Sequence, residues 1–456
     1  MTLAAALSRL PPPVRIPGAR GTIRSSLEKS GKKLIVIDDD PTGTQTVHGV
    51  RVYMDWSEST LAGAFQRSDP VFYVSTNSRS LPGPQAAALA ADLGRTLRKV
   101  STAAAVDFVV ASRSDSTLRG HFPSEVSALV SELASPIDAV ILVPAFFEAG
   151  RYTLNDIHWV DDGTELVAAH QTEFARDPDF GFRHSNLKDW VEEKTRGAVK
   201  AGDVISIPLR ELRLKGPAHV ADILCTAEKG IPVVANAVCY EDLEVLALAV
   251  IQAESRGRRF VYRTAASFVK VRAGLEDRPF LTREKIRPAG RAGLVVVGSY
   301  VEKTTRQLEQ LLRAKHVQGV ELQASPPGIE RAAREASLCL ERGITPVIFT
   351  SRARQQSEDF LATGKALMSC LCETVRRITG SPAWIIAKGG ITSIELARSA
   401  LGVEAADVMG QVIKGVPVWR LASKGPWSDV PYIVFPGNVG DDSALLKVFT
   451  LLEGGT

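Results

Sequence analysis

Short apolar runs recur along the chain and alternate with longer segments of helical periodicity, and this alternation constrains the fold more than any other feature. The runs are KLIVI, VFYVS, DFVVA, AVILVPA, DVISI, IPVVA, RFVYR, GLVVVG, PVIFT and WIIAK. Segments such as PQAAALAADLGRTLRKV and TTRQLEQLLRAKH lie between several of them. Because strands that alternate with helices are typical of parallel sheets, we predict an α/β protein.

The length of the chain predicts more than one domain. A chain of 456 residues exceeds what one hydrophobic core normally holds. A polar stretch without clear periodicity, residues 272–293, is followed by a new strand-like run, LVVVGSY. We therefore expect two domains, each a largely parallel sheet flanked by helices. The expected ranges are 1–30 for an N-terminal arm, 31–287 for the first domain and 288–456 for the second.

Composition excludes several classes of protein. The chain is 45% hydrophobic and 23% charged, with a formal net charge of +4 and no long Lys/Arg block, so a nucleic-acid partner is not expected. Its longest apolar runs are too short to cross a membrane. The five cysteines show no CxxC pairing, which favours free thiols in a reducing, cytoplasmic protein.

The first 30 residues are basic and faintly resemble a transit peptide. They contain five Lys or Arg residues against the single acid Glu28. Pro11, Pro12 and Pro13 would interrupt an amphipathic helix, so we favour an ordinary N-terminal arm.

Polar residues gather directly after the predicted strands, where ligands bind in parallel α/β sheets. Three consecutive aspartates, Asp38 to Asp40, follow the first run and precede Thr42 and Gly43. Adjacent carboxylates repel one another and resist burial, so they need partners or solvent. Strand alternation would place Asp38 and Asp40 on one side and Asp39 on the other, unless a turn intervenes.

The loop SRSDSTLRGH, residues 112–121, suits a small hydroxylated anion. Arg113 and Arg119 flank Asp115 and Ser116. Arginine binds carboxylates through two parallel hydrogen bonds, and Asp and Ser can bind hydroxyl groups. A hydrogen-bonded turn without a ligand is the plainer alternative.

Two glycine-containing loops follow strands in the second half, GGITS at residues 389–393 and PGNVG at residues 436–440. Each could be a simple helix cap or a cradle for phosphate built from backbone N–H groups. No P-loop motif, no G-x-G-x-x-G after the first strand, no zinc motif H-E-x-x-H and no G-x-S-x-G elbow occurs.

One rival class fits the aspartates. Phosphatases of the haloacid-dehalogenase type carry D-x-D-x-T after their first strand, which Asp38, Asp40 and Thr42 match, and their lysine could be Lys388. Their nucleophile would be Asp38. However, that fold completes its motifs in one compact domain, whereas here the last motifs lie beyond the expected boundary.

The combined motifs resemble those of the four-carbon acid sugar kinase family over nearly the whole chain. The family pattern D-D-x-T-G, D-S-T-L-R-G, P-A-x-x-x-x-G-R, G-S, G-G-x-T-S and G-N-x-G occurs here in order. It stands at residues 39–43, 115–120, 144–151, 298–299, 389–393 and 437–440. The resemblance implies an ATP-dependent kinase with magnesium as a further cofactor. Its first domain would bind the acid sugar and its second domain the nucleotide.

The substrates that the resemblance implies are threonate, erythronate, 3-oxo-tetronate or the branched 3-oxo-isoapionate. The implied catalytic residues are Asp39 and Asp40, one of which would be the base. The implied substrate-binding residues are Thr42, Arg79, Arg113, Asp115, Ser116, Arg119 and Arg151. The implied nucleotide-binding residues are Ser299, Gly389, Gly390, Ile391, Thr392, Gly437, Asn438 and Gly440.

The segment TQTVHGV after Gly43, and Asn77 before Ser-Arg, depart from the common family pattern. Both lie in the expected substrate domain, so they leave the identity of the acid open. A non-catalytic protein that binds a sugar acid is the third hypothesis, and it would be favoured if no nucleotide bound. The metal ligands and the assembly also stay open, with a homodimer as one option.

Overall fold

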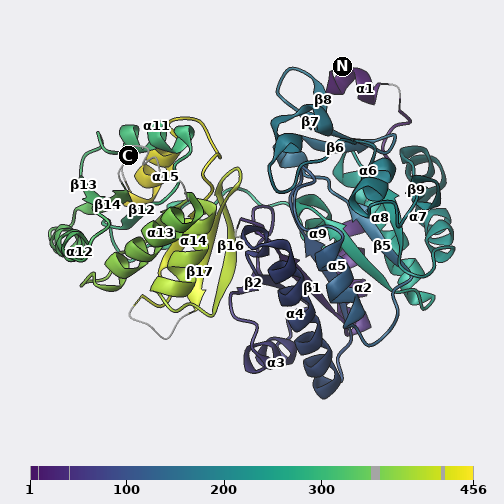
Figure 1. The fold of residues 1–456 in the computed structure, drawn as a ribbon, viewed down its shortest axis with the longest axis horizontal. Coiled ribbons are helices and arrows are strands. Elements are labelled where there is room, and N and C mark those ends of the chain that lie inside the picture. The colour runs from purple at the N-terminus through teal and green to yellow at the C-terminus, as the bar shows by residue number, and fades with distance from the viewer. Residues whose placement is uncertain (1, 9, 41, 351–359, 423–426, 455–456) are drawn as a thin grey trace. The chain divides into compact units, whose positions relative to one another are not determined.

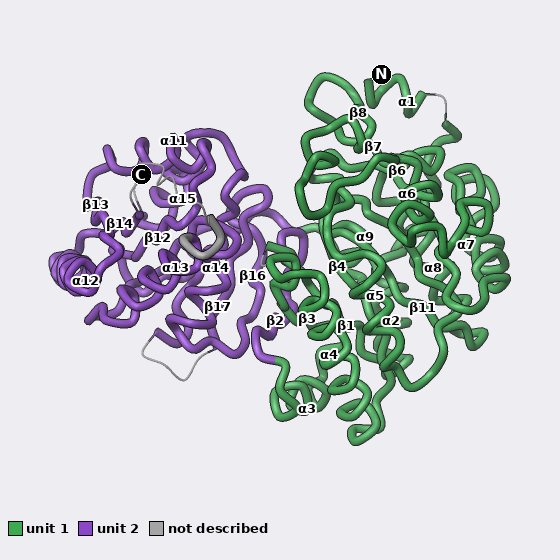
Figure 2. Tube along the Cα trace, viewed as in Figure 1, with its two compact units in different colours: residues 1–43, 56–277 green, residues 44–55, 278–456 purple. Residues whose placement is uncertain are grey.

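The computed structural model describes residues 2–8, 10–40, 42–350, 360–422 and 427–454. Within them the chain forms two compact units, which Figure 2 colours separately. The first unit comprises residues 1–43 and 56–277, and the second comprises residues 44–55 and 278–456. The fold is α/β, as the sequence predicts (Figure 1).

The first unit is built on seven parallel strands. Their order across the sheet is β3, β1, β4, β11, β5, β10 and β9. The strands are β1 (Lys33–Asp38), β3 (Val71–Ser75), β4 (Phe108–Arg113), β5 (Ala139–Val143), β9 (Ile205–Ile207), β10 (Ile231–Ala235) and β11 (Phe260–Thr264). The central strands are buried on both faces, which is why they read as continuous apolar runs in the sequence.

Nine α-helices belong to the described part of this unit. They are α1 (Leu3–Leu7), α2 (Ala19–Ser30), α3 (Glu58–Gln66), α4 (Gly83–Ala104), α5 (Ser124–Ser131), α6 (Leu187–Lys194), α7 (Leu209–Cys225), α8 (Tyr240–Ser255) and α9 (Ala266–Arg272). Helix α4 buries Ala90, Leu93, Leu97 and Val100, at the spacing of one helix face. The expected N-terminal arm contains α2, whose buried Arg20 donates to Glu244 of α8 at 2.9 Å.

A separate antiparallel sheet of three strands is inserted after β5. It consists of β6 (Arg151–Leu154), β7 (Ile157–Asp161) and β8 (Leu166–Ala168). None of the apolar runs from which strands were predicted lies in this part of the chain. Alternating burial along β7 explains the miss, because its buried positions include a histidine rather than a run of aliphatic residues.

The second unit combines parallel and antiparallel strands. Its order is β13, β14, β12, β15, β18, β17, β16 and β2, parallel as far as β18 and antiparallel beyond it. The strands are β2 (Val50–Tyr53), β12 (Leu294–Val297), β13 (Val317–Leu322), β14 (Thr345–Thr350), β15 (Ile385–Lys388), β16 (Ala405–Ile413), β17 (Val416–Ala422) and β18 (Pro431–Phe435). The helices are α10 (Arg283–Ile286), α11 (Glu302–Leu311), α12 (Pro326–Glu341), α13 (Phe360–Arg376), α14 (Gly390–Glu395) and α15 (Ala444–Glu453).

Strand β2 comes from the N-terminal part of the chain but belongs to the second unit. It pairs antiparallel with β16, so that Val50 lies opposite Val408 and Tyr53 opposite Ala405. Trp419 of β17 donates to the Thr44 hydroxyl at 2.9 Å. The chain therefore leaves the first unit directly after Gly43, adds one strand to the second unit, and returns.

Candidate functional site

The carboxyl ends of the first unit's central strands are aligned. Asp38, Ser75 and Arg113 are the last residues of β1, β3 and β4, and the ladder pairs Asp38 with both of the others. Thr264, which ends β11, pairs with Arg113. The loops that follow these strands therefore begin at one edge of the sheet, where α/β proteins bind ligands.

Asp38 lies beneath this edge as a buried partner of Arg113. Its side chain accepts a hydrogen bond from Arg113 Nη1 at 3.2 Å and one from the Asp40 amide at 3.3 Å. Only 1% of Asp38 is exposed. Burial raises the pKa of Asp38 to about 7, although the Arg113 charge opposes the shift. Asp38 is thus a structural support for the residues that follow it.

Gly43 is required by the position of Asp38. A Cβ atom at residue 43 would lie 1.5 Å from Asp38 Oδ2, far inside any allowed contact. The Gly43 amide also closes the turn by donating to the Asp40 carbonyl at 3.2 Å. Only glycine lets the chain turn this tightly over a buried carboxylate.

Arg79 joins the two other aspartates. Its Nη2 and Nε atoms lie 2.5 and 3.3 Å from the oxygens of Asp39, and its Nη1 lies 2.9 Å from Asp40 Oδ2. Strand β1 ends at Asp38, so the alternation that would separate Asp39 from Asp40 does not continue. Asp39 and Asp40 face the same guanidinium, and Asp38 faces another. A turn after Asp38 thus breaks the strand alternation of the three aspartates, which is the alternative that the sequence left open.

Asp39 and Asp40 differ in accessibility. The Asp39 side chain is 5% exposed and the Asp40 side chain 26%. Thr42 donates to Asp40 Oδ1 from its amide at 2.7 Å and from its hydroxyl at 2.5 Å. Burial works against ionisation of Asp40, but the charges of Arg79 and Arg113 outweigh it and lower the pKa of that carboxyl.

Asp115 and Arg119 complete the cluster from the loop after β4. Arg119 Nε donates to Asp115 Oδ2 at 2.8 Å, and Arg79 Nη1 lies 3.9 Å from Asp115 Oδ1. Burial opposes the ionised form of Asp115, yet Arg79 and Arg119 hold its pKa well below the usual range. Carboxylates and guanidiniums thus alternate in this cluster, an arrangement that suits polar groups held in fixed directions.

The remaining candidates of the first unit take different places. Arg113 is committed to Asp38, and 5% of it is exposed. Arg151 and Arg119 both lie over the Phe174 ring, at 5.5 and 5.1 Å from its centre. The Ser116 carbonyl accepts a hydrogen bond from His158. Arg79 and Arg119 thus bond to the aspartates of the cluster, whereas Arg113 bonds to Asp38 and Arg151 to the backbone carbonyls of Ala149 and Gly150.

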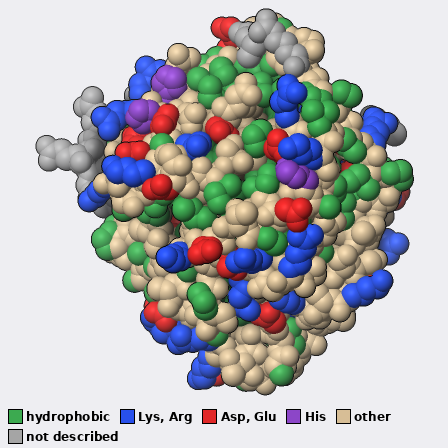
Figure 3. Space-filling view, turned by 90° about the vertical axis from the view of Figure 1, so that its right-hand side faces the viewer, with side chains coloured by type: hydrophobic (Ala, Val, Ile, Leu, Met, Phe, Trp, Pro, Cys, Tyr) green, Lys and Arg blue, Asp and Glu red, His purple; other side chains and the backbone are tan. Residues whose placement is uncertain are grey.

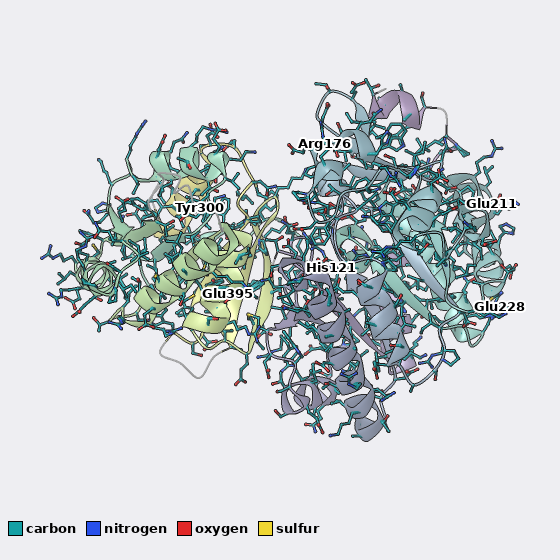
Figure 4. The ribbon with its side chains drawn as sticks, viewed as in Figure 1. His121, Arg176, Glu211, Glu228, Tyr300 and Glu395 are labelled. Atoms are coloured by element: carbon teal, nitrogen blue, oxygen red, sulfur yellow. The ribbon has the colours of Figure 1, made fainter. Side chains whose placement is uncertain are left out.

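Several polar residues around Asp39 were missed by sequence reasoning. The Ser114 hydroxyl donates to Asp39 Oδ2, and the Ser78 hydroxyl donates to the buried Glu125. Arg263 of β11 is buried, and a Cβ atom at Gly120 would lie 2.9 Å from its Nη2 and 3.1 Å from Asp39 Oδ2. The arginine that ends the run RFVYR was the available signal. His121, labelled in Figure 4, is the last residue of the segment SRSDSTLRGH, and burial lowers its pKa.

The glycine loops of the second unit converge at one sheet edge. Lys388, the last residue of β15, pairs with Val297 of β12 and with Phe435 of β18, both of which also end their strands. A Cβ at Gly437 would lie 2.7 Å from Ser299 Oγ, and a Cβ at Gly389 would lie 2.8 Å from Thr392 Oγ1. Thr304 donates to the Gly437 carbonyl at 2.8 Å. The structure thus brings four of the predicted nucleotide-binding residues together.

Two other candidates, Asn438 and Gly440, lie in the loop PGNVG after β18. The Asn438 carbonyl accepts from Lys303 Nζ at 3.3 Å. Gly440 has φ +81°, and a Cβ there would lie 2.3 Å from Ala444 Cβ. Gly440 therefore allows the loop to enter helix α15 directly.

Lys388 is a buried lysine at the base of these loops. It is fully buried, and its ammonium donates to the carbonyls of Pro436 at 2.7 Å and Gly437 at 3.2 Å. It also lies over the Phe435 ring, 4.2 Å from its centre. Burial lowers the pKa of Lys388 to about 7. No carboxylate partner of Lys388 is found among the described residues, so an anion at this edge would be stabilised by it.

Apolar side chains stand exposed beside the same loops. Tyr300 and Val301 follow Ser299, and Ile391 lies in the first turn of helix α14, which begins at Gly390 within GGITS; they are 42, 47 and 52% exposed. Tyr300 is labelled in Figure 4. Exposed apolar residues beside a polar cradle are typical of a site that takes a flat, partly apolar ligand.

No preformed metal site occurs in the described ranges, since no group of three or more His, Cys, Asp or Glu side chains there is placed to hold a metal ion. Magnesium that accompanies a nucleotide is usually held by phosphates, waters and one or two carboxylates. No described helix is long and apolar enough to cross a membrane. On the face in Figure 3, side chains of both charges are interspersed.

Two family models match the chain, one in each half. Residues 34–272 match the sugar-binding N-terminal domain, and residues 294–445 match the nucleotide-binding C-terminal domain. The first match contains the cluster around Arg79, and the second contains the glycine loops around Ser299. No curated protein matches the sequence.

Solved structures share the fold at low sequence identity. A Salmonella typhimurium LT2 protein, provisionally described as a tRNA synthase, is 18% identical and superimposes with a TM-score of 0.67, over 91% of this chain and 98% of its own. A Haemophilus influenzae protein of the DUF1537 family is 17% identical, with a TM-score of 0.62 over 92% of this chain and 99% of its own. A citrate-bound DUF1537 protein from Bordetella bronchiseptica is 22% identical with a TM-score of 0.41, over 92% and 98% of the two chains. The first two show the fold alone.

Proposed function

Because the chain belongs to the four-carbon acid sugar kinase family, we propose that it is an ATP-dependent kinase acting on a hydroxyl group of a small sugar acid. The acceptor would have four or five carbons. Threonate, erythronate, 3-oxo-tetronate and 3-oxo-isoapionate are the candidates.

One observation carries this proposal. Asp39, Asp40, Asp115, Arg79 and Arg119 form a single cluster within the range that matches a sugar-binding domain. Guanidiniums suit the carboxylate of a sugar acid, and carboxylates suit its hydroxyl groups. The same chain continues into a nucleotide-binding domain. A domain for each reactant is what transfer from a nucleotide to a sugar acid requires.

We assign roles from these contacts. Arg119 and Arg151, which both lie against the Phe174 ring, would bind the substrate carboxylate. Either Asp39 or Asp40 would accept the proton of the attacking hydroxyl, because a sugar hydroxyl is a weak nucleophile without a base. Asp40 is the more accessible of the two.

In the second unit, ATP would contact Ser299, the loop 389–392 and the loop 437–440. Lys388 would supply positive charge beneath the phosphates. Magnesium would neutralise phosphate charge during transfer.

The rival phosphatase mechanism is disfavoured by Asp38. A phosphatase of that class would use Asp38 as an exposed nucleophile. Here Asp38 is buried, is bonded to Arg113, and lies against the backbone of Gly43. A non-catalytic binding protein would account for the first unit but would leave the nucleotide-binding domain without a role.

A screen of acids with ATP tests the proposal. Each candidate acid is incubated with the protein, ATP and magnesium, and release of ADP is measured. We expect one acid or a close pair to stimulate ADP release well above the rate with no acid. Binding of an acid without any ADP release would favour the binding-protein alternative.

A matched pair of arginine variants tests the assignment within the site. Arg119→Met should raise the KM of the acid sharply, because truncating one partner of a charge pair that the bound substrate would bury costs about 2–5 kcal/mol. Arg113→Met should act mainly on stability, since Arg113 is paired with Asp38. Equal KM values for wild type and Arg119→Met would refute the assignment.

We also propose a cytoplasmic location, which the five free cysteines support. Sedimentation of the purified protein tests a homodimer. A monomer at all accessible concentrations would exclude it.

A further inference from the structure

His158 lies at the centre of the inserted antiparallel sheet and is fully buried. Its ring has a polar partner at each nitrogen. Nε2 lies 2.7 Å from the Ser116 carbonyl, and Nδ1 lies 3.1 Å from the Thr153 hydroxyl on the neighbouring strand β6. The backbone amide of His158 donates to the Ser185 carbonyl at 2.8 Å. The ring is therefore fixed in place from several elements.

These partners determine the tautomer of the ring. A carbonyl oxygen can only accept, so Nε2 must carry the proton that bonds to Ser116. In a neutral ring Nδ1 then has a free lone pair, and the Thr153 hydroxyl donates to it. The nearby charges of Arg151 and Asp115 oppose each other, and burial lowers the pKa of His158 to about 4. His158 is thus neutral near pH 7, with its proton on Nε2.

The carbonyl that His158 holds belongs to the loop between Asp115 and Arg119. This loop is strained, because Leu118 adopts φ +69° although it is a buried leucine. Its internal turn is weak, with the Leu118 amide 3.4 Å from the Asp115 carbonyl. Within the loop, Thr117 and Arg119 also donate to the Asp115 side chain, and contacts from outside the loop add to these in holding its shape. The His158 contact is a short bond of this kind.

We propose that His158 is a positioning residue for this loop: its Nε2–H group holds the Ser116 carbonyl and so fixes where Asp115 and Arg119 present their charges to the substrate. The inference rests on the proposed function, in which that loop binds the sugar acid. In this proposal the inserted sheet β6–β8 supports the loop through His158 of β7. No chemical step passes through His158.

Nitrogen NMR of histidine-labelled protein tests the geometry without reference to any reaction. We expect the His158 ring, assigned by its loss in His158→Gln, to be neutral near pH 7 and protonated at Nε2. A ring protonated at Nδ1, or at both nitrogens, would overturn the inference whether or not the protein is a kinase.

Two substitutions then separate positioning from packing. Glutamine can place an N–H group near the position of Nε2, whereas leucine cannot. In the protein without ligand, His158→Leu should accelerate amide exchange of residues 116–119 by roughly tenfold, the effect of losing one buried hydrogen bond, and His158→Gln should restore most of the protection. Equal exchange in all three proteins would refute the positioning role.

Kinetics of the same variants extend the test to the site. His158→Leu should raise the KM of the sugar acid roughly tenfold and leave the KM of ATP unchanged, with rescue by His158→Gln. His170→Leu is the control: His170 is exposed, lies just after β8, and its ring contacts the Ser185 hydroxyl rather than the Ser116 carbonyl, so the variant should behave as wild type. Equal loss in the Gln and Leu variants would mean that His158 only fills space. If wild type phosphorylates no acid, the proposed function fails, and exchange and NMR still decide the inference.

Discussion

Three consecutive aspartates occupy three environments at the end of β1. Asp38 is buried against Arg113, Asp39 is nearly buried between Arg79 and Ser114, and Asp40 is partly exposed above Thr42. The clustering of like charges is offset because each carboxylate has its own cationic or hydroxyl partner. Residue identity alone could not have separated these roles.

Asparagine variants of the three aspartates test that separation. Whichever of Asp39 and Asp40 is the base, its Asn variant should lower kcat by a factor of about 10²–10⁴. The KM of ATP should change little, because the proposed ATP contacts lie in the other unit. Asp38→Asn should keep turnover within a few-fold of wild type. A protein inactivated only by Asp38→Asn would contradict the kinase assignment of this segment.

The depressed pKa of His158 predicts a pH-dependent stability. The neutral ring is favoured in the folded state, so its contribution is fully present above the ordinary pKa of about 6.5 and is lost as pH falls through about 4. The interval corresponds to about 3 kcal/mol of unfolding free energy. Urea unfolding of wild type and His158→Gln near pH 7 and near pH 4 measures it. The stability difference between them should shrink by that amount on acidification, and a constant difference would contradict the pKa shift.

Some site residues were visible in the sequence, and others were not. Gly43, Asp115 and Arg119 could be predicted because they belong to short motifs at strand ends. His158 could not, since a histidine in an alternating strand reads as a solvent-facing residue until its partners at Ser116 and Thr153 are known. Arg263 lies at the end of the run RFVYR on strand β11, where only the fold shows what its charge faces.

Elements buried on both faces were predicted well. All ten apolar runs correspond to strands, because two-sided burial leaves a continuous apolar run. The antiparallel strands were missed. Strand β16 alternates between buried and less buried positions, and Gly410 within it, at φ +139°, breaks the pattern further. Strands β6 to β8 are short and polar, so periodicity could not distinguish them from loops.

The glycine loops of the second unit offer a test at the scale of the element. Gly437→Ala would place a Cβ atom 2.7 Å from Ser299 Oγ and push the two loops apart. We expect the KM of ATP to rise at least roughly tenfold while the KM of the acid stays unchanged, since a misplaced backbone N–H loses its hydrogen bond to the ligand. Isothermal calorimetry with a non-hydrolysable ATP analogue measures the binding directly.

Gly364→Ala is the matched control for that variant. Residue 364 lies in helix α13 of the same unit, where a Cβ meets nothing within 4 Å. It should bind the analogue as wild type does. Unchanged affinity in Gly437→Ala as well would remove this loop from the nucleotide site.

The two units are interleaved in sequence, and this shapes how the whole molecule can be divided. Residues 44–55 supply β2 to the second unit, where Arg51 lies 3.7 Å from Asp407 and Trp419 bonds to Thr44. Sequence analysis placed this segment in the first domain because no local signal marks which sheet a short strand joins. The boundary between residues 287 and 288, which separates the expected substrate-binding domain from the expected nucleotide-binding domain, stays a prediction.

A fragment comprising residues 278–456 should therefore be unstable by itself. Without β2, the pairing edge of β16 is left exposed, which promotes aggregation. Joining residues 44–55 to the start of this fragment through a flexible linker should restore a cooperative thermal transition. An unlinked fragment that melts cooperatively at the same temperature as the linked one would show that β2 is dispensable.

Phosphorus NMR of the complete reaction tests the central claim most directly. Protein, ATP, magnesium and the acid chosen from the screen are mixed, and every phosphorus signal is followed with time. The account predicts that a phosphomonoester of the acid appears in step with ADP, without accumulation of inorganic phosphate. Formation of inorganic phosphate alone, or hydrolysis of an added sugar-acid phosphate without ATP, would contradict it.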